Sequence, residues 1–128
     1  MIVAPITSAL ATLGAVALVA LSIPVSMRRF QAKIPIGHGR DKVLEYRSRA
    51  QANFVEYVPA ALIVLALAEA NGAPALWVAA CGGALVVGRA VHAYGMLAGG
   101  KVRPRQLGML LTWGALLAGA AALVSRLT

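Results

Sequence analysis

The feature that most constrains this chain is an uninterrupted run of uncharged, mostly apolar residues from Ile2 to Val25. A helix needs about 20 such residues to cross the hydrocarbon core of a bilayer. Over the whole chain of 128 residues, 60% are hydrophobic and 12% are charged. A soluble fold of this size could not hide that much apolar surface, and exposed apolar patches aggregate. The sequence therefore predicts an integral membrane protein.

Three further apolar runs follow the first, and short polar segments separate them. We expect one domain over residues 1–128, with spans at 2–25, 43–69, 75–97 and 107–124. The expected fold class is all-α: a bundle of four transmembrane helices with up-and-down topology. The segment from Met27 to Asp41 is expected to be the first loop, because Pro35, Gly37 and Gly39 disfavour a helix there.

The net charge of +8 is concentrated at the ends of the apolar runs. The segments after the first and third spans hold nearly all the Lys and Arg residues that lie outside the helices. The positive-inside rule then places both segments in the cytoplasm and both chain termini outside it. This distribution indicates membrane topology and argues against nucleic acid as a partner. No eukaryotic targeting signal appears, so we expect a bacterial inner membrane.

The second span carries polar residues on two faces. Arg49, Asn53 and Glu56 are spaced to share one face of a helix, whereas Arg47 and Gln51 lie on roughly the opposite face. Ionisable groups at membrane depth usually have a partner or a ligand. We therefore expect a second subunit to cover one face, which gives an oligomer with a polar cleft between subunits. Alternatively, Arg49 and Glu56 form a structural ion pair and Arg47 reaches lipid headgroups.

The third and fourth spans add a smaller set of candidates. Arg89 and His92 stand three residues apart and face the same way. Tyr94 suits either the site or the membrane interface. Arg103 and Arg105 form a cationic pair that suits either the mouth of the cleft or lipid headgroups. No His and Cys residues stand at metal-ligand spacing, so we expect no metal site.

With these motifs, the chain resembles the family of membrane-associated proteins in eicosanoid and glutathione metabolism. The most specific part is the run from Arg49 to Pro59, and Gly88–Arg89 and Arg103–Gly108 support it. The resemblance implies a homotrimer of four-helix subunits that binds glutathione between neighbours, as cosubstrate. The positions implied for glutathione binding are Arg28, Arg29, Arg49, Gln51, Asn53, Glu56, Tyr57, Arg89, His92 and Tyr94.

The chemistry of glutathione agrees with this set. Arginine side chains suit its two carboxylates, and Glu56 suits its ammonium. The family also implies a catalytic arginine at the start of the fourth span, which holds the thiol as thiolate. Arg103 and Arg105 both fit that position, and spacing does not choose between them. The chain departs from the family's pattern where His92 and Met96 stand in place of tyrosines.

The resemblance implies a membrane-embedded glutathione transferase, or a peroxidase that uses the same thiolate. Its partners would be a lipophilic electrophile and the surrounding membrane lipids. The alternative is a non-catalytic scaffold of the same fold that binds glutathione or lipid. A small proton-coupled transporter is the less favoured interpretation. Small multidrug transporters carry their essential Glu in the first helix, and the first span here has no ionisable residue.

Overall fold

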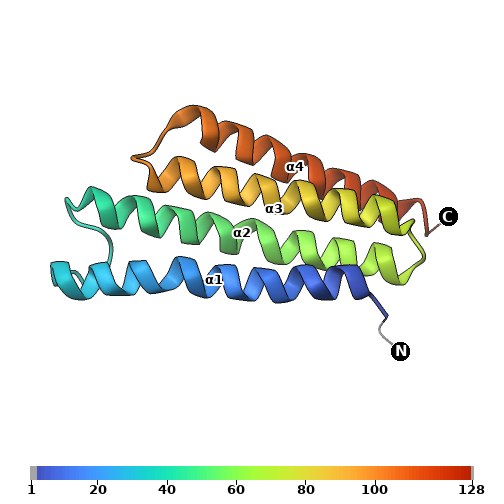
Figure 1. The fold of residues 1–128 in the computed structure, drawn as a ribbon, viewed down its shortest axis with the longest axis horizontal. Coiled ribbons are helices and arrows are strands. Elements are labelled where there is room, and N and C mark those ends of the chain that lie inside the picture. The colour runs from blue at the N-terminus through green and yellow to red at the C-terminus, as the bar shows by residue number, and fades with distance from the viewer. Residues whose placement is uncertain (1–2, 128) are drawn as a thin grey trace.

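The computed structural model describes residues 3–127, which form an all-α bundle (Figure 1). Four helices, all long and apolar enough to cross a membrane, make up this part of the chain. They are α1 (Pro5–Ala32), α2 (Lys42–Ala70), α3 (Ala75–Leu97) and α4 (Val102–Val124). Each helix runs antiparallel to the one before it, so the expected all-α, four-span, up-and-down membrane bundle is confirmed.

Two helices are longer than hydropathy predicts. The first helix continues to Ala32, so the predicted loop at 27–41 is wrong in its first part and the actual loop is 33–41. The fourth helix begins at Val102 rather than at Leu107. In both places, helix-forming charged residues extend the helix past the apolar core, where a hydropathy window no longer detects it. The predicted start of the first span at Ile2 lies outside the described residues.

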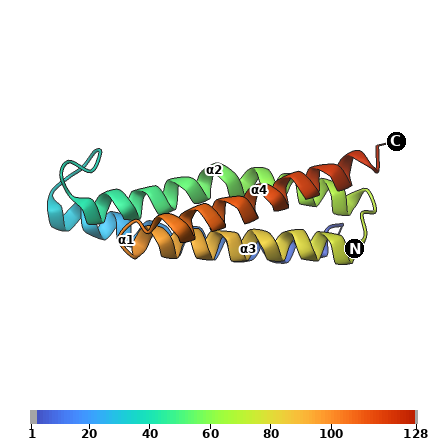
Figure 2. The ribbon, with the colours of Figure 1, turned by 90° about the horizontal axis from the view of Figure 1, so that it is seen from above.

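The second helix is the centre of the bundle. It contacts all three other helices, whereas α1 touches α3 sparsely and does not touch α4 within residues 3–127. Seen from above, α1 lies behind α3, and α4 crosses the bundle obliquely on the side of α2 (Figure 2). One groove lies between α1 and α3, and another opens where α2, α3 and α4 meet.

The third and fourth helices pack with their backbones in contact. A Cβ atom built on Gly88 would lie 2.9 Å from the carbonyl oxygen of Gly108. A Cβ atom on Gly108 would lie 2.6 Å from the backbone nitrogen of His92. Small residues at such crossings allow close helix packing in lipid. This contact fixes which face of α4 points toward α2.

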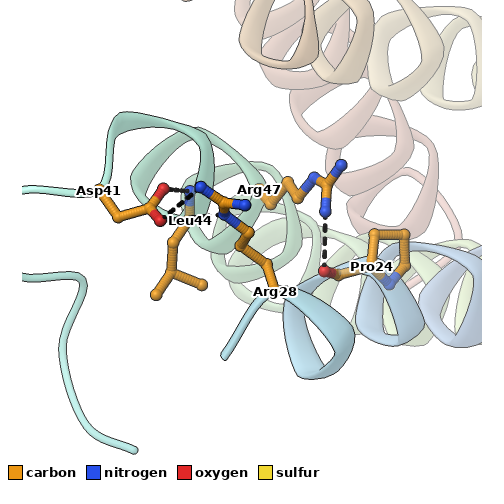
Figure 3. Close-up of polar contacts among 5 residues, drawn as sticks. All are labelled: Pro24, Arg28, Asp41, Leu44 and Arg47. Atoms are coloured by element: carbon orange, nitrogen blue, oxygen red, sulfur yellow. Dashed lines mark hydrogen bonds and ion pairs between the residues drawn. The ribbon is translucent and has the colours of Figure 1, made fainter. Parts of the chain in front are cut away.

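We call the end of the bundle with loops 33–41 and 98–101 the basic end. There the Arg28 guanidinium pairs with Asp41 at 2.8 Å, and Asp41 caps α2 by accepting a hydrogen bond from the Leu44 N–H at 2.9 Å (Figure 3). The Leu44 N–H, and then Arg28, lower the pKa of Asp41 below its usual value. Arg29 donates to the Gly37 carbonyl at 2.6 Å. The two arginines thereby hold the first loop against α1.

The opposite end, with loop 71–74, is closed by Glu69. Its carboxylate accepts hydrogen bonds from the backbone N–H groups of Ile6 and Thr7 at 2.9 and 2.8 Å. It also accepts one from the Thr7 hydroxyl at 2.7 Å. The first N–H groups of a helix have no partner within the helix and favour a negative charge. The last turn of α2 thus caps the first turn of α1.

Candidate functional site

A polar cleft opens at the basic end, between α2 on one side and α3 and α4 on the other. Its volume is about 350 Å³. Its lining residues are Glu45, Tyr46, Arg49, Ala52, Asn53 and Glu56 on α2, His92 and Met96 on α3, and Arg105 on α4. A second hollow of about 620 Å³ continues along α4 past Gln106, Met109 and Trp113. The two hollows share Asn53, His92 and Arg105, so they form one continuous surface.

Arg49 and Glu56 face this cleft without a partner. The ion pairs among residues 3–127 are Arg28 with Asp41 and Lys42 with Glu45. Neither Arg49 nor Glu56 takes part in them, and both side chains are exposed. The structure therefore does not contain the ion pair that the alternative interpretation expected. Because both side chains are exposed and form no ion pair in the described chain, each can contact a molecule that enters the cleft.

Arg89 lies beneath the cleft and is 6% exposed. Its Nε donates to the Thr112 hydroxyl at 2.9 Å, and a terminal nitrogen donates to the side-chain oxygen of Asn53. A further contact reaches the Gly108 carbonyl at 3.4 Å, and the guanidinium stands 5.7 Å from the centre of the Tyr57 ring. No carboxylate within residues 3–127 pairs with it. Arg89 thus joins three helices and places an uncompensated positive charge under the cleft.

His92 lies one turn beyond Arg89 on α3. It is 6% exposed and lines both hollows. The backbone of α4 packs directly against it, because Gly108 has no side chain. An imidazole in this position can donate or accept a hydrogen bond at the point where the two hollows meet.

Comparison with known proteins identifies the family. The model of the MAPEG family matches residues 7–125 of the chain. The chain belongs to the MAPEG family. It is 37% identical over 107 residues to "Inner membrane protein YecN" of Escherichia coli strain K12, which covers 84% of this chain and 81% of the relative. The protein of the same name from Escherichia coli O6:H1 matches to the same extent. With its four apolar helices, this MAPEG chain is an integral, multi-pass membrane protein.

In this MAPEG chain, α1 covers the face of α2 that lies opposite the polar cleft. Gln51 donates to the Ser22 hydroxyl at 2.8 Å, and Arg47 donates to the Pro24 carbonyl at 3.2 Å (Figure 3). Part of the cover that was expected from a second subunit is thus supplied by α1, which provides polar acceptors within one chain. The trimer remains a prediction that rests on the MAPEG resemblance. Gln51 also lies away from the cleft.

Several other predicted glutathione ligands lie outside the cleft of the single chain. Arg28 and Arg29 are bound to the first loop. Tyr94 is exposed, and Lys101 lies 3.4 Å from its hydroxyl. Tyr57 stands beside Arg89 rather than in the lining. The residues that the structure does bring together at the cleft are Arg49, Asn53, Glu56, His92 and Arg105, with Arg89 directly beneath.

The structure distinguishes the two arginines at the start of α4. Arg105 lines the cleft, whereas Arg103 does not. Gly95 lets this turn approach α3, since a Cβ there would lie 2.9 Å from the Arg105 nitrogen. Of the two arginines, Arg105 is thus the one that faces the cleft.

Glu45 and Tyr46 also line the cleft, and they are not among the site residues predicted from the sequence. Glu45 stands four residues before Arg49, so its spacing already placed it on the same face. The Tyr46 ring packs against Gly100 in the loop between α3 and α4, where a Cβ would lie 2.7 Å from the ring. No sequence pattern indicates that contact. Among residues 3–127, no cluster of three or more potential metal ligands exists.

Proposed function

We propose that the cleft binds glutathione and that the protein is a membrane-embedded glutathione transferase. The observation that supports this most directly is that Arg49 and Glu56 face an open cleft without a partner in the described chain. A cation and an anion about two helical turns apart suit a ligand that carries both charges. Glutathione has two carboxylates, one ammonium and a thiol.

The positions of the side chains suggest how each part of the peptide would be held. Arg49 would bind a carboxylate through paired hydrogen bonds, and Glu56 would bind the ammonium. The side-chain oxygen of Asn53 already accepts from Arg89, so its NH₂ group is available to donate into the cleft. Three different groups would then fix the orientation of the peptide.

Arg105 would activate the sulfur. A nearby cation lowers the pKa of a thiol, and the thiolate is the nucleophile. The buried charge of Arg89 would act in the same direction from below. The thiolate would attack an electrophilic carbon, form the carbon–sulfur bond and release the leaving group with its electron pair. Reduction of a lipid peroxide by the same thiolate is a related activity of this proposal.

Membership in the MAPEG family supports the proposal, whereas the name of the bacterial relative gives only a location. We further propose that the protein resides in a bacterial inner membrane as a homotrimer. The basic end would face the cytoplasm, where glutathione is available, and both termini would face outward. The lipophilic electrophile would reach the thiolate from the bilayer.

The test is glutathione binding by calorimetry on detergent-purified protein, followed by turnover with chlorodinitrobenzene. We expect saturable binding and release of chloride in step with formation of the thioether. Arg49→Ala should weaken binding, and Arg40→Ala, which removes a charge from the first loop, should not. Binding without turnover would favour the non-catalytic scaffold. Absence of binding by the wild-type protein would refute the proposal.

A further inference from the structure

The second groove of the bundle lies between α1 and α3 and has α2 as its floor. It encloses about 290 Å³ and is almost entirely apolar. Small residues on its walls keep it open, including Gly14 and Ala17 on α1 and Ala90 and Ala93 on α3. Phe54 and Val58 form part of the floor. The bundle therefore has an apolar slot that is separate from the polar cleft, with Arg89 between the two.

Arg89 lines the groove itself, and a second cation lies beyond the last lining residues, toward the basic end. Arg47 stands seven residues before Phe54, which is two helical turns toward the basic end on the same face of α2. Gln51 lies between them and is bound to Ser22. The slot is thus apolar apart from Arg89, and the polar groups of Gln51 and Arg47 lie beyond its basic end.

Arg47 has capacity for a further anion. Its guanidinium makes one hydrogen bond within residues 3–127, to the Pro24 carbonyl, and no ion pair (Figure 3). Nearby Arg28, by contrast, is neutralised by Asp41. A guanidinium has five N–H donors in a planar fork, which suits a phosphate. Arg47 is half-buried, so water satisfies its remaining donors only in part.

We propose that this groove is a binding site for one anionic phospholipid, with an acyl chain between α1 and α3 and the phosphate on Arg47. The length of the groove agrees with that of an acyl chain in one leaflet. The groove follows α1 from Leu10 to Leu21, which is about 16 Å of helix at 1.5 Å per residue. That length is close to one leaflet, since the hydrocarbon core is about 30 Å thick. The inference does not rest on the proposed glutathione chemistry, which uses the polar cleft, although Arg89 lines this groove and also lies beneath that cleft.

The experiment is native mass spectrometry of the full chain, released from detergent and titrated with phosphatidylglycerol. We expect a lipid adduct on each subunit that survives detergent removal. Arg47→Gln should lower its affinity about tenfold, the effect of losing one charge-assisted contact. Arg40→Gln is the matched control, because it removes a charge at the same end away from the groove.

A second pair of variants tests the chain-binding part. Ala17→Phe fills the groove and should abolish the adduct, whereas Ala15→Phe, on the exposed side of α1, should leave it unchanged. Wild-type affinity in both Arg47→Gln and Ala17→Phe would overturn the proposal. An equal loss of phosphatidylglycerol affinity in Arg40→Gln would also overturn the proposal. The lipid would then be attracted by surface charge in general and not by Arg47. If Ala17→Phe changes the oligomeric mass but not the lipid adduct, a second copy of the chain covers the groove and the proposal is wrong.

Discussion

The side-chain oxygen of Asn53 on α2 accepts a hydrogen bond from the buried guanidinium of Arg89 on α3. The same guanidinium donates to Thr112 on α4. The three helices that surround the cleft are therefore tied together directly below its floor. The orientation of the Asn53 amide toward the cleft depends on this arginine, although Arg89 itself is covered.

Arg89→Lys should weaken glutathione binding about tenfold, on the scale of one charge-assisted hydrogen bond. Lysine keeps the positive charge but lacks the planar fork that reaches Asn53 and Thr112 together. Calorimetry measures the affinity. Arg103→Lys is the matched control and should bind like the wild type. Unchanged affinity in Arg89→Lys would show that Asn53 does not depend on this contact.

Glu56→Gln should weaken glutathione binding about tenfold to a hundredfold, because it removes a charge-assisted contact worth roughly 1.5–3 kcal/mol. The partner is expected to be the ligand's ammonium. An analogue of glutathione without its amino group should therefore bind the wild type and Glu56→Gln equally. If the analogue still distinguishes the two proteins, Glu56 does not bind the ammonium.

Arg105→Ala should raise the pKa of the bound thiol and slow turnover while glutathione still binds, because a cation beside sulfur favours the thiolate. Arg103→Ala should change neither quantity, since Arg103 lies outside the cleft. The near-ultraviolet absorption of the thiolate, followed against pH in the bound complex, reports the titration. If Arg103→Ala raises the thiol pKa and slows turnover whereas Arg105→Ala does not, Arg103 is the residue beside the sulfur.

Glu69→Gln should lower the free energy of unfolding by about 1–2 kcal/mol, because a neutral amide interacts less favourably with the first turn of α1. Thr7→Val removes one of the same hydrogen bonds. The two effects should be less than additive in the double variant, since both act on one contact. Unfolding in mixed micelles measures them. Strict additivity would show that Thr7 and Glu69 contribute independently.

Asp41 should make stability depend on pH. Its pKa is lowered from the usual 3.8 by the Leu44 N–H and by Arg28. Its contribution is therefore fully present above pH 3.8 and is lost as the pH falls through the lower folded value. Unfolding of the wild type and Asp41→Asn should differ at neutral pH and converge in acid. A difference that stays constant across this range would exclude Asp41 as its source.

The spans and the polar stripe could be predicted because both depend on local periodicity. Hydropathy locates each helix, and helix geometry places Arg49, Asn53 and Glu56 on one face. The partners of Arg47 and Gln51 could not be predicted, because Pro24 and Ser22 become neighbours only when α1 packs on α2. The sequence therefore did not indicate that α1 provides acceptors for this face of α2.

The choice between Arg103 and Arg105 depends on the rotation of α4 about its own axis. The contact of Gly88 with Gly108 sets that rotation, and no periodic pattern in the sequence indicates which glycines meet. The error in the predicted end of α1 had a different cause. Charged residues carry α1 past the apolar core, so hydropathy located the span but not the whole helix.

The capping of α1 by Glu69 has a consequence for how the first two helices assemble. The acceptor for the N–H groups of Ile6 and Thr7 lies in the last turn of α2. Until α2 has packed against α1, these N–H groups have no protein partner. We therefore expect the two helices to gain stability together, as a hairpin, rather than one at a time.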